Sequence, residues 1–169
     1  NHYSRIPPIA PSLTSVNSYD PVQARAMTKS DIRDFRRWHR KAALRSKQAG
    51  FDLVYVYAGH NLTLLMHFLS RRFNQRTDEY GGSIENRIRL FREVLEETIE
   101  AVGDNCAIAV RFAVDELLGP KGITCKSEGR EVVEILAEIP DLWDVNISEW
   151  ENDSATSRFQ KEGYQEPYI

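Results

Sequence analysis

The stretch Asp52-Leu-Val-Tyr-Val-Tyr-Ala-Gly-His60 begins as a buried strand and ends in two polar aromatic side chains. Its β-branched and aromatic residues follow Gly50, as is typical of a strand entered directly from a helix. Tyr57 and His60 would then lie where the strand ends. Such a pair could simply mark the place where a strand passes into a turn. Whether it belongs to a functional site depends on where the other polar residues lie.

Three amphipathic helices are expected to alternate with three strands. Thr28 and Asp31 form a capping-box pattern, and apolar residues then recur at helical spacing until Gly50. Ser83 and Gly103 bound a second helix, and Ser127 and Pro140 a third. The strands are expected at residues 51–57, 106–114 and 142–147. Residues 1–26, which hold four of the seven prolines, and residues 61–82 are expected to be loops.

This order of helices and strands gives parallel βα units, which occur in doubly wound sheets and in (β/α)8 barrels. Polar residues fall at or just past the expected carboxyl ends of successive strands, which is the active-site face of a barrel. They are Tyr57, His60, Arg111, Asp115, Trp150 and Asp153. No glycine-rich phosphate-binding motif is present. The sequence therefore predicts an α/β fold, about three consecutive βα units of a larger TIM barrel.

Composition excludes several classes of protein. The chain is 41% hydrophobic and 28% charged, with a net charge of -3, which argues against a nucleic-acid partner. No apolar run approaches the length of a membrane helix, so a cytoplasmic protein is expected. Cys106 and Cys125 have no metal-binding spacing, and no metal site is expected. Basic residues gather on the first helix, where we expect a solvated face: Arg36, Arg37, Arg40, Lys41, Arg45 and Lys47.

The run from Asn74 to Arg87, NQRTDEYGGSIENR, resembles the Old Yellow Enzyme superfamily of flavin-dependent (β/α)8 barrels. Its pattern N-x-R-x-D-x-[YW]-G-G-S-x-x-N-R is long and specific. Gly81-Gly82 permits a tight entry into the capped helix, and Asp78 and Arg87 are suited to fixing the loop against it. The resemblance covers essentially all 169 residues. It implies that residues 1–169 are an internal fragment of one FMN-binding TIM-barrel domain.

The polar residues after the first strand narrow the resemblance to one branch. Most ene-reductases of the superfamily carry H-x-x-[HN]-x-Y there, but this chain has Tyr57, His60 and Leu62, so the proton-donating tyrosine is replaced. Tyr-x-x-His is similar to the dimethylamine and trimethylamine dehydrogenases. Trp150-Glu-Asn-Asp153 resembles the W-x-x-D that completes their active site.

The resemblance implies a catalytic triad of Tyr57, His60 and Asp153. A carboxylate bonded to imidazole fixes its tautomer and raises its proton affinity, while the phenol shares the proton. Such a set can hold a substrate amine in its neutral form while a flavin oxidises the adjacent C–H bond. Trp150 would form one wall of the substrate pocket by cation–π attraction. Arg111 is expected to bind FMN at its N1/C2=O edge, the alternative being a salt bridge to Asp115 or Asp144.

The expected activity is FMN-dependent oxidative N-demethylation of a small secondary or tertiary amine. The alternatives are an NAD(P)H-dependent ene-reductase or 2,4-dienoyl-CoA reductase-like flavoenzyme, and, from another class, a catalytically silent barrel fragment that serves as a scaffold. A [4Fe-4S] cluster is expected only in a missing C-terminal part. The full-length protein is expected to be a homo-oligomer that passes electrons to an electron-transfer flavoprotein. The isolated fragment is expected to be inactive.

Overall fold

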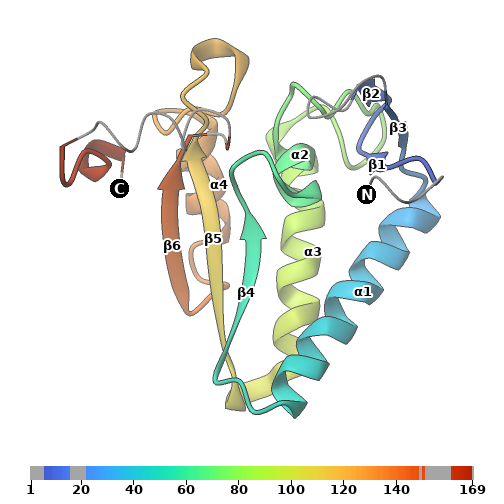
Figure 1. The fold of residues 1–169 in the computed structure, drawn as a ribbon, viewed down its shortest axis with the longest axis vertical. Coiled ribbons are helices and arrows are strands. Elements are labelled where there is room, and N and C mark those ends of the chain that lie inside the picture. Colours follow the sequence, from blue (N-terminus) through green and yellow to red (C-terminus); the bar gives the residue numbers. More distant parts are fainter. Residues whose placement is uncertain (1–5, 16–21, 149, 151–160, 169) are drawn as a thin grey trace.

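A parallel sheet of three strands forms the centre of the structure, a computed structural model that describes residues 6–15, 22–148, 150 and 161–168. The strands are β4 (Leu53–Ala58), β5 (Ala107–Asp115) and β6 (Leu142–Ile147), hydrogen-bonded in the order β4-β5-β6. All three carboxyl ends point the same way (Figure 1). Each strand was predicted within two residues of its observed bounds.

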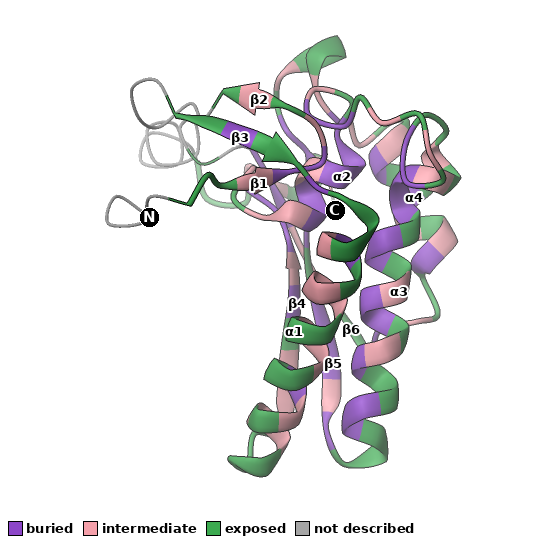
Figure 2. Ribbon diagram, turned by 90° about the vertical axis from the view of Figure 1, so that its right-hand side faces the viewer, coloured by how far each residue is buried: buried purple, intermediate pink, exposed green. Residues whose placement is uncertain are grey.

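Helices cover one face of this sheet. They are α1 (Lys29–Gln48), α3 (Ile84–Val102) and α4 (Glu128–Leu136). Figure 2 shows α3 and α4 on one side of the strands, and α1 packs against α3. Alternate strand residues on that side are buried, among them Val56, Val110, Phe112 and Ile147. Side chains on the opposite side include Tyr55 and Leu142, about half of whose surface is exposed. The sheet is thus packed on one face only within the described residues.

The helix boundaries follow from the caps in the sequence. Thr28 and Asp31 form the predicted capping box at α1, and the Ser83 side chain accepts a hydrogen bond from Asn86 N at α3. Both helices end next to glycines in the left-handed region, Gly50 at φ 84° and Gly103 at φ 58°. Short 3-10 helices occupy Gly103–Asn105, Gly119–Lys121 and Glu166–Tyr168.

Two segments that were expected to be loops contain regular structure. Within residues 1–26, the strands β1 (Ile9–Ala10), β2 (Thr14–Ser15) and β3 (Gln23–Ala26) form a small sheet in the order β1-β3-β2. Within residues 61–82, α2 (Leu64–Leu69) is capped by Thr63, and four of its six residues are buried. These elements are too short to show a clear period in the sequence, and packing stabilises them.

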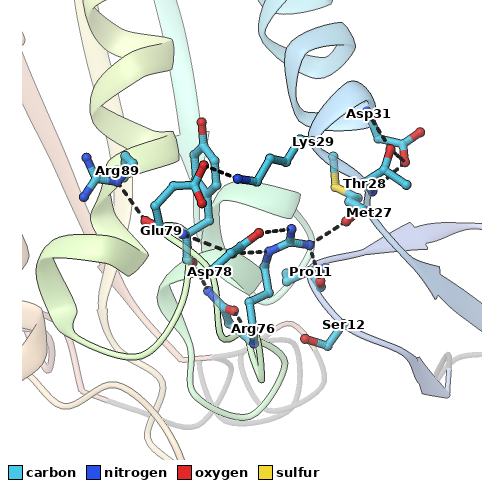
Figure 3. Close-up of polar contacts among 12 residues, drawn as sticks. Pro11, Ser12, Met27, Thr28, Lys29, Asp31, Arg76, Asp78, Glu79 and Arg89 are labelled. Atoms are coloured by element: carbon cyan, nitrogen blue, oxygen red, sulfur yellow. Dashed lines mark hydrogen bonds and ion pairs between the residues drawn. The ribbon is translucent and has the colours of Figure 1, made fainter.

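Arg76, from the motif that carries the resemblance, joins these two segments. Its guanidinium donates to the carbonyl of Pro11 at 2.9 Å and to that of Met27, and it pairs with the Asp78 carboxylate (Figure 3). Arg76 and Asp78 thereby fix the long loop against the small sheet and the start of α1. The pKa of Asp78 is lowered, chiefly by the hydrogen bond from Arg76. This part of the motif is architectural.

The basic face of α1 is only partly solvated, which corrects the prediction. Arg36 pairs with Glu93 at 3.0 Å and with Glu97, and Arg40 donates to the Glu97 carbonyl at 3.1 Å. Lys47 donates to the Val102 carbonyl at 2.5 Å. These cations bind α3, so part of the charge serves to hold two helices together.

The described residues contain no helix that is both long and apolar enough to cross a membrane. In the same residues, no three His, Cys, Asp or Glu side chains are grouped so as to hold a metal ion.

Candidate active site

A row of polar side chains crosses the sheet on the face without helices. Strand register places Tyr57 beside Arg111 and Arg111 beside Asp144. The Arg111 guanidinium lies 3.5 Å from the Asp144 carboxylate and is about half exposed. The prediction placed Arg111 at the end of its strand. The structure places it in the middle of β5. It is level with Tyr57 because β5 runs further than β4 toward the carboxyl edge.

Tyr57 and His60 are in direct contact just past the end of β4. The Tyr57 hydroxyl and His60 Nδ1 form a hydrogen bond, with the two rings inclined at 64°. The imidazole is largely buried, at 6% exposure. Because the phenol engages Nδ1, a proton on Nε2 can be directed to a different acceptor.

An unusual backbone conformation presents the imidazole. His60 and Asn61 have φ values of 51° and 57°, in the left-handed region that residues other than glycine rarely adopt. His67 of α2 holds this turn, because its Nε2 lies 3.0 Å from the Asn61 carbonyl oxygen and must donate to it. The His67 ring also stacks on Phe73. Burial lowers the pKa of His67, which keeps it neutral near neutral pH.

Trp150 contacts His60 beyond the carboxyl ends of β4 and β6. The Trp150 amide donates to the His60 carbonyl at 3.0 Å, and the two ring centroids lie 6.4 Å apart with the planes at 84°. β4 and β6 are not neighbours in the sheet, so this contact brings together the segments that follow them. Ser148, at φ 76°, donates its amide to the Asp115 carbonyl at 2.7 Å and helps to turn the chain there. The Trp150 side chain is 56% exposed.

The remaining predicted residues divide into two cases. Asp153 lies outside the described residues. Asp115 is turned toward the loop after β5, where its carboxylate accepts from the amides of Leu117 at 2.8 Å and Cys125 at 3.0 Å. Asp115 therefore shapes a loop and forms no ion pair with Arg111 among the described contacts.

One polar residue of this site was missed by sequence reasoning. Asn146 lies next to the end of β6, and its side chain reaches Gly59, whose position would bring an added Cβ to 3.3 Å from both amide heavy atoms. A polar residue two positions beyond Asp144 in a strand was the available signal. Its burial under the His60 turn depends on packing that the sequence does not display.

Comparisons with known proteins identify the family of the chain. A sequence model of the NADH:flavin oxidoreductase / NADH oxidase family matches residues 7–168. Dimethylamine dehydrogenase of Hyphomicrobium sp. (strain x) is 42% identical over 131 residues, which are 76% of this chain and 18% of that enzyme.

Two solved structures are closely similar. A 6-hydroxypseudooxynicotine amine oxidase from Pseudomonas geniculata N1 superposes with a TM-score of 0.93 at 54% identity, over 99% of this chain and 25% of that one. A histamine dehydrogenase from Rhizobium sp. 4-9 gives a TM-score of 0.89 at 51% identity, over 99% of this chain and 24% of that one. This chain thus spans a quarter or less of each of these three relatives.

Proposed function

Because the chain belongs to the NADH:flavin oxidoreductase / NADH oxidase family, the Old Yellow Enzyme family recognised in its sequence, we propose that it is part of an FMN-dependent amine dehydrogenase. The fold agrees with the predicted class, parallel βα units of a TIM barrel. We propose oxidative N-demethylation of a small secondary or tertiary amine as the reaction. The observation that carries the proposal is the hydrogen bond between Tyr57 and His60 Nδ1 beside the Trp150 ring.

The residues present fit a flavin. The Arg111 guanidinium is about half exposed on the open face of the sheet, level with Tyr57, and its one carboxylate partner among the described residues lies at the long distance of 3.5 Å. A permanent cation at this place can bind and stabilise the negative charge that a flavin gains at its N1/C2=O edge. When bound, FMN would accept the hydride equivalent from the C–H bond beside the amine nitrogen.

The chain's own residues would control the proton. With His60 protonated on Nε2, the Tyr57 hydroxyl donates to Nδ1, and its oxygen can accept a proton from a bound ammonium. The phenol proton then passes to Nδ1, which leaves the amine neutral and reactive. In this proposal Asp153 accepts from Nε2 and stabilises the imidazolium. Oxidation gives an iminium ion, to which water adds before the C–N bond breaks to release a shorter amine and an aldehyde.

Trp150 would bind the alkylated nitrogen. The residue is 56% exposed and its ring plane lies at 84° to that of His60, so a cation held against the ring would lie beside the proton-accepting pair. Cation–π attraction is worth about 0.5 to 2 kcal/mol, depending on desolvation. That attraction favours substrates with a charged, alkylated nitrogen over neutral enones.

Two other functions remain as rivals. An NAD(P)H-dependent ene-reductase would need a proton donor where this chain has Leu62, whose side chain is apolar and exposed. A scaffold role would leave the contact between Tyr57 and His60 without purpose. Because the chain spans 18% of the dimethylamine dehydrogenase, the activity of the whole protein is itself part of the proposal. The proposal also includes a [4Fe-4S] cluster outside this chain, an electron-transfer flavoprotein as partner, a homo-oligomeric state and a cytoplasmic location.

Anaerobic reduction of the intact flavoprotein tests the proposal. We expect a yellow protein whose flavin absorbance is lost on addition of dimethylamine or trimethylamine but not of NADPH. Histamine belongs in the panel, because loss of colour with histamine alone would change the substrate from an N-methylated to a primary amine. Reduction by NADPH would support the ene-reductase, and a colourless protein that reacts with none of these compounds would support the scaffold.

A further inference from the structure

Asp144 lies beside Arg111, the residue proposed to bind the flavin. The two residues are direct neighbours in the register of β5 and β6, and Arg111 Nη1 lies 3.5 Å from Asp144 Oδ2. Neighbouring residues of adjacent strands project from the same face of a sheet, so both side chains lie on the face without helices. The Arg111 side chain is 45% exposed and that of Asp144 is 31% exposed, which leaves both accessible to a ligand on that face.

This ion pair is not needed to hold the two strands together. The backbone ladder already joins β5 to β6 from Ala109 to Asp115, and a partly exposed ion pair adds little to stability. The guanidinium has five N–H donors, and Asp144 is its only side-chain partner in the part of the chain that the structure describes. Most of these donors therefore remain available while the carboxylate stays in place.

The position of the pair determines how much charge a flavin on this face would meet. Tyr57 is the β4 neighbour of Arg111, so Tyr57, Arg111 and Asp144 form one row across the open face. A lone guanidinium would present a full positive charge to a ring at this place. A carboxylate 3.5 Å away offsets part of that charge, and the exclusion of water by a bound ring would strengthen the effect.

We propose that Asp144 is a positioning residue that acts through Arg111: it holds the guanidinium in this row and lowers the reduction potential of the bound FMN. The inference rests on the proposed function. Two-electron reduction by the amine places negative charge at the N1/C2=O edge, which a full cation would stabilise most strongly. By offsetting that cation, the carboxylate allows the reduced flavin to pass its two electrons on to the electron-transfer flavoprotein proposed as the acceptor.

The reduction potential of the intact flavoprotein, followed by flavin absorbance, tests this inference. Asp144→Asn keeps an oxygen that can accept from Arg111 and removes only the negative charge. We expect the equilibrium between oxidised and two-electron-reduced flavin to shift about tenfold toward the reduced form, a rise of about 30 mV for a two-electron couple. The matched control is Asp104→Asn, which removes the same charge from an exposed residue before the amino end of β5 and should leave the potential unchanged.

A double variant separates an effect through Arg111 from a direct effect on the flavin. When Asp144→Asn is added to Arg111→Gln, the potential should shift much less than in the wild-type background, because the cation that the carboxylate offsets is absent. A potential that does not rise in the single variant Asp144→Asn would overturn the inference. An equal rise with and without Arg111 would also overturn it, since the carboxylate would then act directly. An intact protein without flavin, or one that amines do not reduce, would instead contradict the proposed function.

Discussion

At the scale of single residues, the candidate site depends on a backbone turn that the side chains alone do not explain. His60 and Asn61 both adopt left-handed φ values, and the Asn61 carbonyl is held by His67. Residues in such conformations cost free energy of about 1–3 kcal/mol each and persist only where the surroundings enforce them. The turn aims the imidazole at the Tyr57 hydroxyl, so the strained segment and the reactive pair are one unit.

Tyr57→Phe tests the role of the phenol. The substitution keeps the ring but removes the hydroxyl that contacts His60 Nδ1, so the amine loses the phenol oxygen as its direct proton acceptor. We expect flavin reduction by the amine to slow by about a hundredfold, within the range of general acid–base catalysis, while flavin content stays constant. Stopped-flow absorbance at saturating amine measures the rate. Tyr55→Phe, which alters an exposed tyrosine of the same strand, should react at the wild-type rate; equal rates for both variants would refute the role of Tyr57.

His67 gives the fold a dependence on pH. Burial lowers its pKa below the unfolded value of about 6.5, so the unfolded chain binds the proton more readily. Its contribution to stability is therefore complete above pH 6.5 and is lost as the pH falls through the lower folded-state pKa. His67→Gln can still donate to the Asn61 carbonyl but cannot titrate. We expect urea unfolding at pH 7 and pH 5 to show a smaller loss of stability in the variant than in the wild type.

His39 is a second buried histidine that should show the same effect on stability. Burial also lowers its pKa, but it lies on α1 and contacts the ring of Phe35, remote in sequence from the His60 turn. His39→Gln should likewise reduce the loss of stability at pH 5, without changing the rate of flavin reduction. An unaltered pH dependence in His67→Gln would mean that the buried imidazole does not titrate in this range.

At the scale of elements, the sequence predicted those helices and strands whose ends and period are both marked. Thr28 and Ser83 cap α1 and α3 as expected, and β6 has the predicted bounds. The α2 helix escaped prediction because six residues show too little periodicity, although Thr63 caps it. The small N-terminal sheet escaped because contacts with distant Arg76, rather than alternation, hold it in place.

Thr28→Ala tests how much the capping box contributes. The Thr28 hydroxyl accepts from Asp31 N, while the Asp31 carboxylate accepts from Thr28 N at 2.7 Å and pairs with Arg25. Loss of the hydroxyl leaves one amide of the first turn without its acceptor. We expect the free energy of unfolding to fall by about 1 kcal/mol in urea titrations. Thr77→Ala, at an exposed loop threonine, should change it by less than about 0.5 kcal/mol; a similar loss at both sites would contradict the assignment.

At the scale of the whole molecule, one buried cation connects the motif loop to two helices. Arg87 has no exposed surface and donates to the carbonyls of Leu69 and Gly82 while pairing with Glu128 of α4. It thus joins the end of α2, the start of α3 and the start of α4. Arg87 of the motif thus has a structural role, as Arg76 has at the other end of the loop.

Arg87→Met tests this connection. Methionine fills much of the volume but leaves two carbonyls without their donor and Glu128 with only the exposed Arg71 as an ion-pair partner among the described residues. We expect a loss of about 3–5 kcal/mol in the free energy of unfolding, as for other buried ion pairs that lose one partner. The control is Arg130→Met, which breaks the exposed pair with Glu134 and should cost less than about 1 kcal/mol. Equal losses would show that Arg87 contributes no more than a surface charge.

The packing of the whole molecule determines parts of the site that could not be predicted from the sequence. Tyr57, His60 and Trp150 were expected together from a resemblance, and the structure places them in contact. Arg111 was assigned to a strand end because the sequence does not show that β5 extends further than β4 toward the carboxyl edge of the sheet. Asn146 was missed, because its burial depends on packing against Gly59, which the sequence does not show.

The open sheet leads to the last prediction, on the isolated 169-residue chain. Among the described strands, β4 and β6 each pair with β5 alone, so both outer edges of the sheet lack partners. The uncovered face adds Tyr55 and Leu142, each about half exposed. Unpaired edges beside exposed apolar side chains promote association.

We therefore expect the isolated chain to self-associate and to lose FMN on desalting, because the remaining strands of a barrel would cover the same face and enclose Arg111. Sedimentation velocity, with flavin absorbance of the desalted protein, measures both properties. Tyr55→Lys should reduce association by placing a charge on the open face, without restoring flavin. A wild-type chain that stays monomeric and yellow would show that three βα units suffice to bind the flavin, and would contradict this prediction.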